Sequence, residues 1–191
     1  MKSLLRVLGL CLSLLVSCSS LAESAFNFYG VSVADGQLFS MRALKERPKV
    51  VNFFWVECQP CKQELPELAQ LQQTYPSVVF LALHKGSESL SAIKTFIDSL
   101  PSAPEKVIKV DDVVAEKYRA NYLPYTLLIN QRGEVVHRLT GYTPENMHRL
   151  EQWLKQYVIK NTKVVDFNKF MEQLDYVDSS GEFTRGNNNE R

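Results

Sequence analysis

The sequence predicts an α/β fold, in which helices on both faces cover a central mixed β-sheet. Short continuous apolar runs, typical of buried strands, alternate along the chain with segments whose apolar residues recur at helical spacing. One of these runs leads directly into an amphipathic helix, and Cys58 and Cys61 lie at the junction. No internal repeat is visible. About 170 residues follow the N-terminal 22, enough for one domain with a buried core.

Residues 1–22 are typical of an export signal. A short basic start precedes an apolar run over 7–16 that is too short to span a bilayer as a permanent helix. Two cleavage sites remain open. An ordinary signal peptidase would cut after Ala22, whereas Leu15-Val16-Ser17-Cys18 is similar to a bacterial lipobox and implies cleavage before a lipidated Cys18. We favour the lipoprotein, because a free exposed thiol beside a redox pair would be a liability. Either way we expect a periplasmic protein that touches a membrane only through such an anchor.

Removal of this segment takes away Lys2 and Arg6 but no acidic residue. The remaining chain has 20 basic and 21 acidic residues, so the formal charge changes from +1 to −1. The sequence shows no basic patch, and we expect no nucleic-acid partner. The histidines, His84, His137 and His148, lack the spacing of metal ligands, and we expect no metal.

The domain is expected to span residues 24–160 and to open with a β-hairpin extension. Residues 26–33 alternate loosely and a turn over 34–37 follows. Ser40 is a suitable N-cap for a brief helix through Glu46.

From there, strands and helices are expected to alternate. The predicted segments are a strand over 49–55, a helix to about residue 75, a strand over 78–83, an amphipathic helix over 88–100, a strand over 107–110, a short helix over 111–120, a hairpin of strands over 125–129 and 134–139, and a final helix over 144–157. Residues 161–191 fall outside this pattern. A helix over 166–174 is compatible with the sequence, and 179–191 is polar, rich in Gly and Asn, and expected to be disordered.

The Cys58-Gln59-Pro60-Cys61 motif predicts a thiol–disulfide exchange site. Unpaired N–H groups and the positive end of the helix dipole stabilise a thiolate at a helix start, where Pro60 loses no hydrogen bond. A zinc site would need two more ligands, and Cys11 and Cys18 lie in the targeting segment. A purely structural disulfide would stabilise the fold by only roughly 2 kcal/mol. Two inert thiols are not expected at an activating position.

Two blocks of sequence resemble the thioredoxin superfamily, and most closely its exported TlpA/ResA-like thiol–disulfide oxidoreductases. The first block, residues 52–68, holds the cysteine pair. The second, residues 118–133 with Gly141, is similar to the family's cis-proline loop, following hairpin and closing glycine. The likeness covers about residues 26–158 and implies a thioredoxin-like fold.

The resemblance also implies roles for individual residues. Cys58 is expected to be the attacking thiol, Cys61 the thiol that resolves the mixed disulfide, and Pro124 a cis-proline facing them. Leu123 and Tyr125 flank this proline and are expected to bind an extended client segment, with Tyr125 narrowing the groove.

The chain departs from the family pattern around the cysteines. Family members usually carry Trp before the first cysteine, but here that position is Glu57, and Trp55 is displaced by two positions. The Glu57 carboxylate would raise the pKa of Cys58 if it faces the sulfur, or would have no effect if it points into solvent. We expect Glu57, Pro60 and Trp55 to modulate the pair. Asn52 occupies the place where cytoplasmic thioredoxins bury an acid, so we expect that proton relay to be missing.

The dipeptide between the cysteines lacks the histidine that helps hold the first thiolate in strong oxidants, which favours a moderately reducing potential. We therefore expect an exported, monomeric disulfide reductase that acts on protein clients, with cytochrome c maturation as the role implied by the resemblance. It would need a membrane electron donor and no cofactor beyond the Cys58–Cys61 disulfide. Two alternatives remain open, a disulfide-forming oxidase or isomerase and a non-catalytic thioredoxin-fold binding module.

Overall fold

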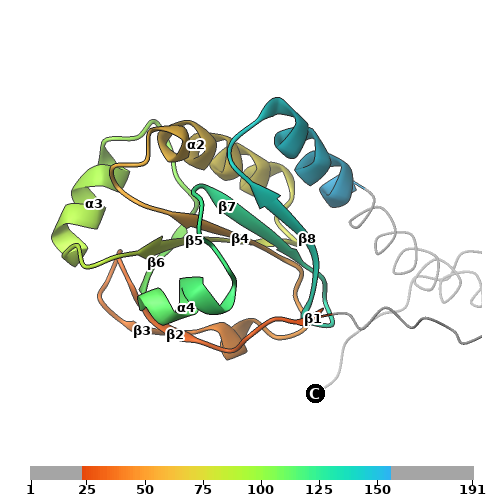
Figure 1. The fold of residues 1–191 in the computed structure, drawn as a ribbon, viewed down its shortest axis with the longest axis horizontal. Coiled ribbons are helices and arrows are strands. Elements are labelled where there is room, and N and C mark those ends of the chain that lie inside the picture. Colours follow the sequence, from red (N-terminus) through yellow and green to blue (C-terminus); the bar gives the residue numbers. More distant parts are fainter. Residues whose placement is uncertain (1–22, 156–191) are drawn as a thin grey trace, which may run out of the picture.

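The computed structural model describes residues 23–155, so the predicted export signal with Cys18 and the C-terminal extension lie outside the described part. One mixed sheet of eight strands runs through the molecule in the order β1-β8-β7-β4-β5-β6-β2-β3 (Figure 1). The strands are β1 (Glu23–Ser24), β2 (Tyr29–Ser32), β3 (Leu38–Ser40), β4 (Lys49–Phe54), β5 (Val79–Lys85), β6 (Lys106–Val110), β7 (Tyr125–Ile129) and β8 (Glu134–Thr140). The helices are η1 (Met41–Leu44), α2 (Gln59–Thr74), α3 (Leu90–Asp98), α4 (Asp112–Lys117) and a last helix described over residues 144–155.

The centre of the sheet is β4, which pairs in parallel with β5 and antiparallel with β7. All six of its residues are buried, which explains why its sequence is continuously apolar rather than alternating. Successive side chains nevertheless point to opposite faces. Val50 and Phe54 pack with α2 on one face, whereas Val51 and Phe53 pack on the other face with residues around α4.

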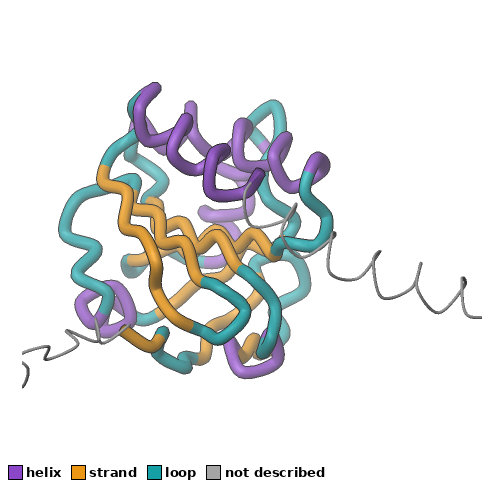
Figure 2. Tube along the Cα trace, turned by 90° about the vertical axis from the view of Figure 1, so that its right-hand side faces the viewer, coloured by secondary structure: helices purple, strands orange, loops and turns teal. Residues whose placement is uncertain are grey.

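Helices therefore cover both faces, as predicted. Helices α2, α3 and the one over residues 144–155 lie on one side of the sheet, and α4 lies on the other with the N-terminal segment (Figures 1 and 2). The predicted α/β class, the mixed sheet and the opening hairpin of β2 and β3 are confirmed.

Four details differ from the predictions. Strand β1, which pairs with β8, was not expected, because two exposed residues carry no periodic pattern. Ser40 ends β3 and makes no side-chain cap hydrogen bond, and only a four-residue 3-10 helix follows it. Helix α3 starts at Leu90 because the Ser89 side chain accepts a hydrogen bond from the Ala92 N–H at 3.2 Å. Helix α4 ends before Arg119, whose φ of 59° is left-handed.

Candidate active site

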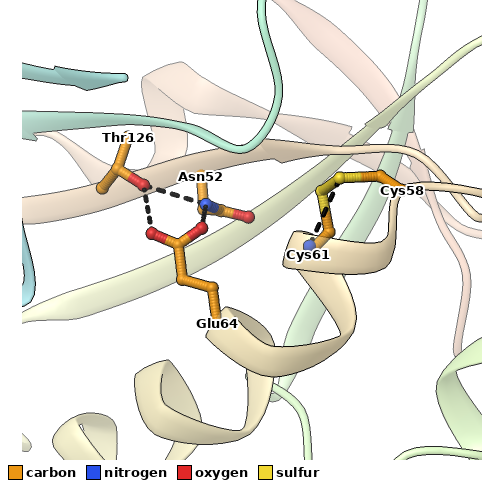
Figure 3. Close-up of a disulfide and its surroundings, with 5 residues drawn as sticks. All are labelled: Asn52, Cys58, Cys61, Glu64 and Thr126. Atoms are coloured by element: carbon orange, nitrogen blue, oxygen red, sulfur yellow. Dashed lines mark hydrogen bonds between the residues drawn. A yellow bond between two sulfur atoms is a disulfide. The ribbon is translucent and has the colours of Figure 1, made fainter. Parts of the chain in front are cut away.

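The cysteine pair lies at the junction between the end of β4 and the start of α2. Cys58 is the N-cap of α2 in an extended conformation, with Pro60 in the first turn. Cys58 and Cys61 form a disulfide with an Sγ–Sγ distance of 2.01 Å (Figure 3). The Cys61 N–H points at the Cys58 Sγ, 3.3 Å away. A thiolate on Cys58 would therefore meet both a backbone donor and the positive end of the helix dipole.

The two sulfurs differ in access. Cys61 is fully buried at 0% exposure among side chains of α2, α3 and the sheet. Cys58 is half-buried and lines an open groove of about 850 Å³. Of the two cysteines, Cys58 is therefore the one that is accessible from the groove, and Cys61 is enclosed behind it.

The groove carries most of the predicted site residues. Its lining includes Trp55, Glu57, Cys58, Pro60 and Leu123. Glu57 is exposed, so its carboxylate is in contact with solvent at the mouth of the groove. The sequence did not single out Tyr122, which also lines the groove and is 76% exposed.

The loop before β7 brings a proline to the site. The Leu123–Pro124 peptide bond is cis, in agreement with the expectation for this position. Pro124 is buried, and its carbonyl accepts a hydrogen bond from the Gly141 N–H at 2.8 Å. Tyr125, however, is buried against Phe53 on the α4 side of the sheet and does not line the groove. The prediction that Tyr125 narrows the groove and binds clients is wrong, because the alternation of β7 turns its side chain into the core.

Position 52 holds an amide, but a buried acid comes from another element, which the expectation of a missing proton relay did not consider. Glu64 lies one helical turn after Cys61 on α2, and only 3% of the residue is exposed. Its carboxylate accepts hydrogen bonds from Asn52 Nδ2 at 2.7 Å and from the Thr126 hydroxyl at 3.1 Å (Figure 3). Asn52 Nδ2 also donates to Thr126 Oγ1 at 2.9 Å. The position that thioredoxins fill with an acid thus holds an amide that orients an acid supplied by the helix.

Burial raises the pKa of Glu64 to about 7, even though the hydrogen bonds from Asn52 and Thr126 act in the opposite direction. A group with this pKa can both bind and release a proton near neutral pH. One sequence signal indicates that Glu64 is buried, namely its position three residues after Cys61. Residues i and i+3 share one face of a helix, and Cys61 is expected to face inward.

Within residues 23–155, no group of three or more His, Cys, Asp or Glu side chains is arranged to hold a metal ion. In the same range, no helix combines the length and the apolar character needed to cross a bilayer.

A two-cysteine redox pair at the start of a helix, with a cis-proline loop beside it on a mixed sheet, defines a thiol–disulfide oxidoreductase of the thioredoxin type. Comparison with known proteins agrees. A model of the thioredoxin-like domain matches residues 38–158. The chain is 33% identical over 115 residues to the thiol-disulfide oxidoreductase ResA of Bacillus subtilis, an alignment covering 59% of this chain and 64% of that protein. It is 30% identical to ResA of Halalkalibacterium halodurans over 137 residues, or 69% of this chain and 74% of that protein.

Solved structures agree in fold. A thiol:disulfide interchange protein of Chlorobium tepidum superposes with a TM-score of 0.59 at 24% identity, covering 72% of this chain and 97% of that one. StoA of Bacillus subtilis superposes with a TM-score of 0.54 at 20% identity, covering 68% of this chain and 96% of that one. The chain belongs to the thioredoxin superfamily, in its ResA-like branch.

Proposed function

We propose that this protein is an exported disulfide reductase that passes two electrons from the Cys58–Cys61 dithiol to disulfides in protein clients of the bacterial cell envelope. By its likeness to the ResA proteins, we propose the maturation of c-type cytochromes as its role. One observation supports the assignment of Cys58 as the attacking thiol and Cys61 as the resolving thiol. Cys58 is open to the groove, whereas Cys61 is fully buried and lies one helical turn before the buried acid Glu64.

The reaction follows from this asymmetry. The Cys58 thiolate attacks one sulfur of the client disulfide, the client S–S bond breaks, and the released client thiolate takes up a proton. The result is a mixed disulfide between Cys58 and the client. Cys61 then loses its proton and attacks the Cys58 sulfur. The mixed disulfide breaks, the second client thiolate leaves, and the Cys58–Cys61 disulfide forms.

Glu64 is the group that we propose receives the Cys61 proton. It is the buried carboxyl on the same face of α2, and its pKa of about 7 allows it to take up a proton at neutral pH. Asn52 and Thr126 keep its carboxylate in place through the hydrogen bonds described above. These two residues act as positioning residues.

The cycle leaves the protein oxidised, so a donor of two electrons must regenerate the dithiol. In an oxidising compartment we propose that this donor is a membrane protein, and that a lipid on Cys18 keeps the otherwise monomeric protein near it. Cys18 lies outside the described residues and its lipidation stays a prediction.

A redox titration of the Cys58–Cys61 pair tests the direction of electron flow. We expect a potential near that of thioredoxin, about −270 mV, whereas a value near about −120 mV, as in strong periplasmic oxidants, would make the protein an oxidase instead. The measurement equilibrates the full-length protein in thiol–disulfide buffers of defined potential and counts alkylated cysteines by mass. If the pair exchanges with none of these buffers, the non-catalytic binding module becomes the better assignment.

A further inference from the structure

An exposed tryptophan stands beside the reactive cysteine. Trp55 directly follows β4, lines the same groove as Cys58, and is 39% exposed. Large aromatic side chains that remain exposed in a groove are enriched at binding sites, because their flat surface gains much contact area with little loss of conformational entropy.

The indole of Trp55 is held in place from one end. Its Nε1–H donates a hydrogen bond to Glu88 Oε1, and Glu88 itself lines the groove. The backbone carbonyl of Glu88 accepts a hydrogen bond from the Lys109 ammonium group. This arrangement ties the indole to the loop between β5 and α3, while 39% of the residue remains exposed.

A buried histidine lies next to the Glu88 carboxylate. Its Oε2 lies 3.4 Å from Nε2 of His84, which is fully buried on β5 and packs edge-on against Phe54 at a centroid distance of 5.3 Å. Gly86, with a φ of 121°, leaves the space that this carboxylate uses, because a Cβ there would lie 2.5 Å from Glu88 Oε2. The loop sequence thus accommodates the carboxylate that orients Trp55.

A second aromatic side chain lines the same groove. Tyr122 lies on the loop just before the cis-proline and is 76% exposed. The groove that leads to Cys58 therefore offers two aromatic surfaces from separate loops. A client segment that lies in it places the side chains beside its own cysteine against these surfaces.

We propose that Trp55, oriented by Glu88, is a specificity-determining residue that favours client segments with an apolar side chain next to the reacting cysteine. This inference rests on the proposed function, since it supposes that Cys58 reacts with protein disulfides. Trp55 would contact the client directly, and Glu88 would act as a positioning residue.

The test uses full-length protein carrying Cys61→Ser, in which the first step stops at the mixed disulfide. Two peptides differ only in having Leu or Ser before a cysteine that is blocked by thionitrobenzoate. The Cys58 thiolate attacks the peptide sulfur, and the thionitrobenzoate anion leaves and is followed by absorbance. The small disulfide of the same reagent serves as a substrate without side chains, and the Cys58→Ser, Cys61→Ser double variant gives the background from other thiols.

We expect the Leu peptide to react faster than the Ser peptide. Trp55→Ala should lower the rate with the Leu peptide about tenfold, the effect of losing one well-packed aromatic contact, and should change the other two rates less than about twofold. Glu88→Ala should reduce the preference for Leu, and Glu88→Gln should restore it because the amide oxygen still accepts the indole hydrogen bond. Tyr29→Ala, which removes an exposed aromatic residue that does not line the groove, is the matched control and should change nothing.

An unchanged ratio of the Leu and Ser rates in Trp55→Ala would overturn the inference. Equal losses on all three substrates would do the same, because they would mean that Trp55 only supports the site. The inference also fails if Tyr29→Ala alters the ratio as much as Trp55→Ala does. If the Cys61→Ser protein reacts with none of the three substrates above background, the proposed function itself fails.

Discussion

Replacement of Glu64 by Gln should remove a pH dependence from the free energy of unfolding of the oxidised protein. Burial raises the pKa of this carboxyl from 4.5 to about 7 in the folded state. Between these two pH values the native state binds more protons than the unfolded state, so stability falls as the pH rises. At 1.36 kcal/mol per pH unit, the full effect of ionising Glu64 is about 3 kcal/mol, reached above pH 7.

The assay is urea-induced unfolding of wild type and Glu64→Gln at pH 4.5, 6 and 8. We expect the wild type to lose about 3 kcal/mol relative to the variant between the first and last pH. Only the difference is informative, because other groups titrate as well. Burial lowers the pKa of His84, so His84 contributes stability that is lost as the pH falls below 6.5, the opposite trend. That contribution is the same in both proteins and cancels.

Glu105→Gln, which removes an exposed carboxylate, is the control and should follow the wild-type curve. A constant difference between wild type and Glu64→Gln at all three pH values would refute the reasoning. It would mean that folding leaves the pKa of Glu64 unchanged, because its hydrogen bonds balance its desolvation. A fixed offset without slope reports only the change from carboxylate to amide.

Four further predictions concern the chemistry and the attachment. Cys58→Ser should abolish reduction of a model disulfide, whereas Cys61→Ser should accumulate mixed disulfides with clients that non-reducing gels detect; turnover by Cys58→Ser would reverse the roles. Glu64→Gln should slow resolution of the mixed disulfide at least about tenfold near pH 7. Stopped-flow kinetics of the wild type and the variant measure this loss. Glu57→Gln should lower the pKa of the Cys58 thiol by no more than about one pH unit, since the exposed carboxylate is screened, and superimposable thiolate absorbance curves would show that the two groups do not interact. The intact mass of membrane-extracted protein should show an acylated N-terminus at Cys18, and a mature chain without lipid would exclude the anchor.

The central strands and helices could be predicted because their signals are local. The run that became β4 is buried on both faces and is therefore apolar at nearly every position, and the helix periods of α2 and α3 appear within single windows of sequence. The cysteine pair was found for the same reason, since its spacing and its place at a helix start are both visible in one short stretch.

The acid at the site could not be predicted in the same way. Asn52 and Thr126 are 74 residues apart in sequence, and Glu64 meets them only because β7 pairs with β4 while α2 packs across both strands. The resemblance to thioredoxins directs attention to position 52 on the strand, where those proteins carry the acid. In this chain a strand amide, Asn52, instead donates a hydrogen bond to a carboxylate on the helix, Glu64.

The failed assignment of Tyr125 has a similar origin. A residue next to the proline was expected at the groove because of its place in the sequence. In β7, however, Tyr125, Leu127 and Ile129 all belong to the hydrophobic cluster on the α4 side of the sheet. The register of the strand therefore determines that the Tyr125 side chain points away from the groove. The exposed aromatic residue of this loop is Tyr122, on the other side of the proline.

The pKa values of Glu64 and Glu88 are shifted in opposite directions, and the surroundings of the two carboxyl groups explain why. Glu64 is almost completely buried, so desolvation outweighs its two hydrogen bonds and its pKa rises to about 7. Burial acts in the same direction on Glu88, but the hydrogen bond from the Trp55 indole, together with a backbone N–H, His84 and Lys109, more than offsets it and lowers the pKa. A carboxyl with a pKa of about 7 can exchange a proton near neutral pH, as the proposed transfer from Cys61 requires, whereas the lowered pKa of Glu88 keeps it a carboxylate that accepts the indole hydrogen bond. Glu64 thus lies on the buried side of the disulfide, whereas Glu88 lines the open groove, where its carboxylate accepts the hydrogen bond from the Trp55 indole.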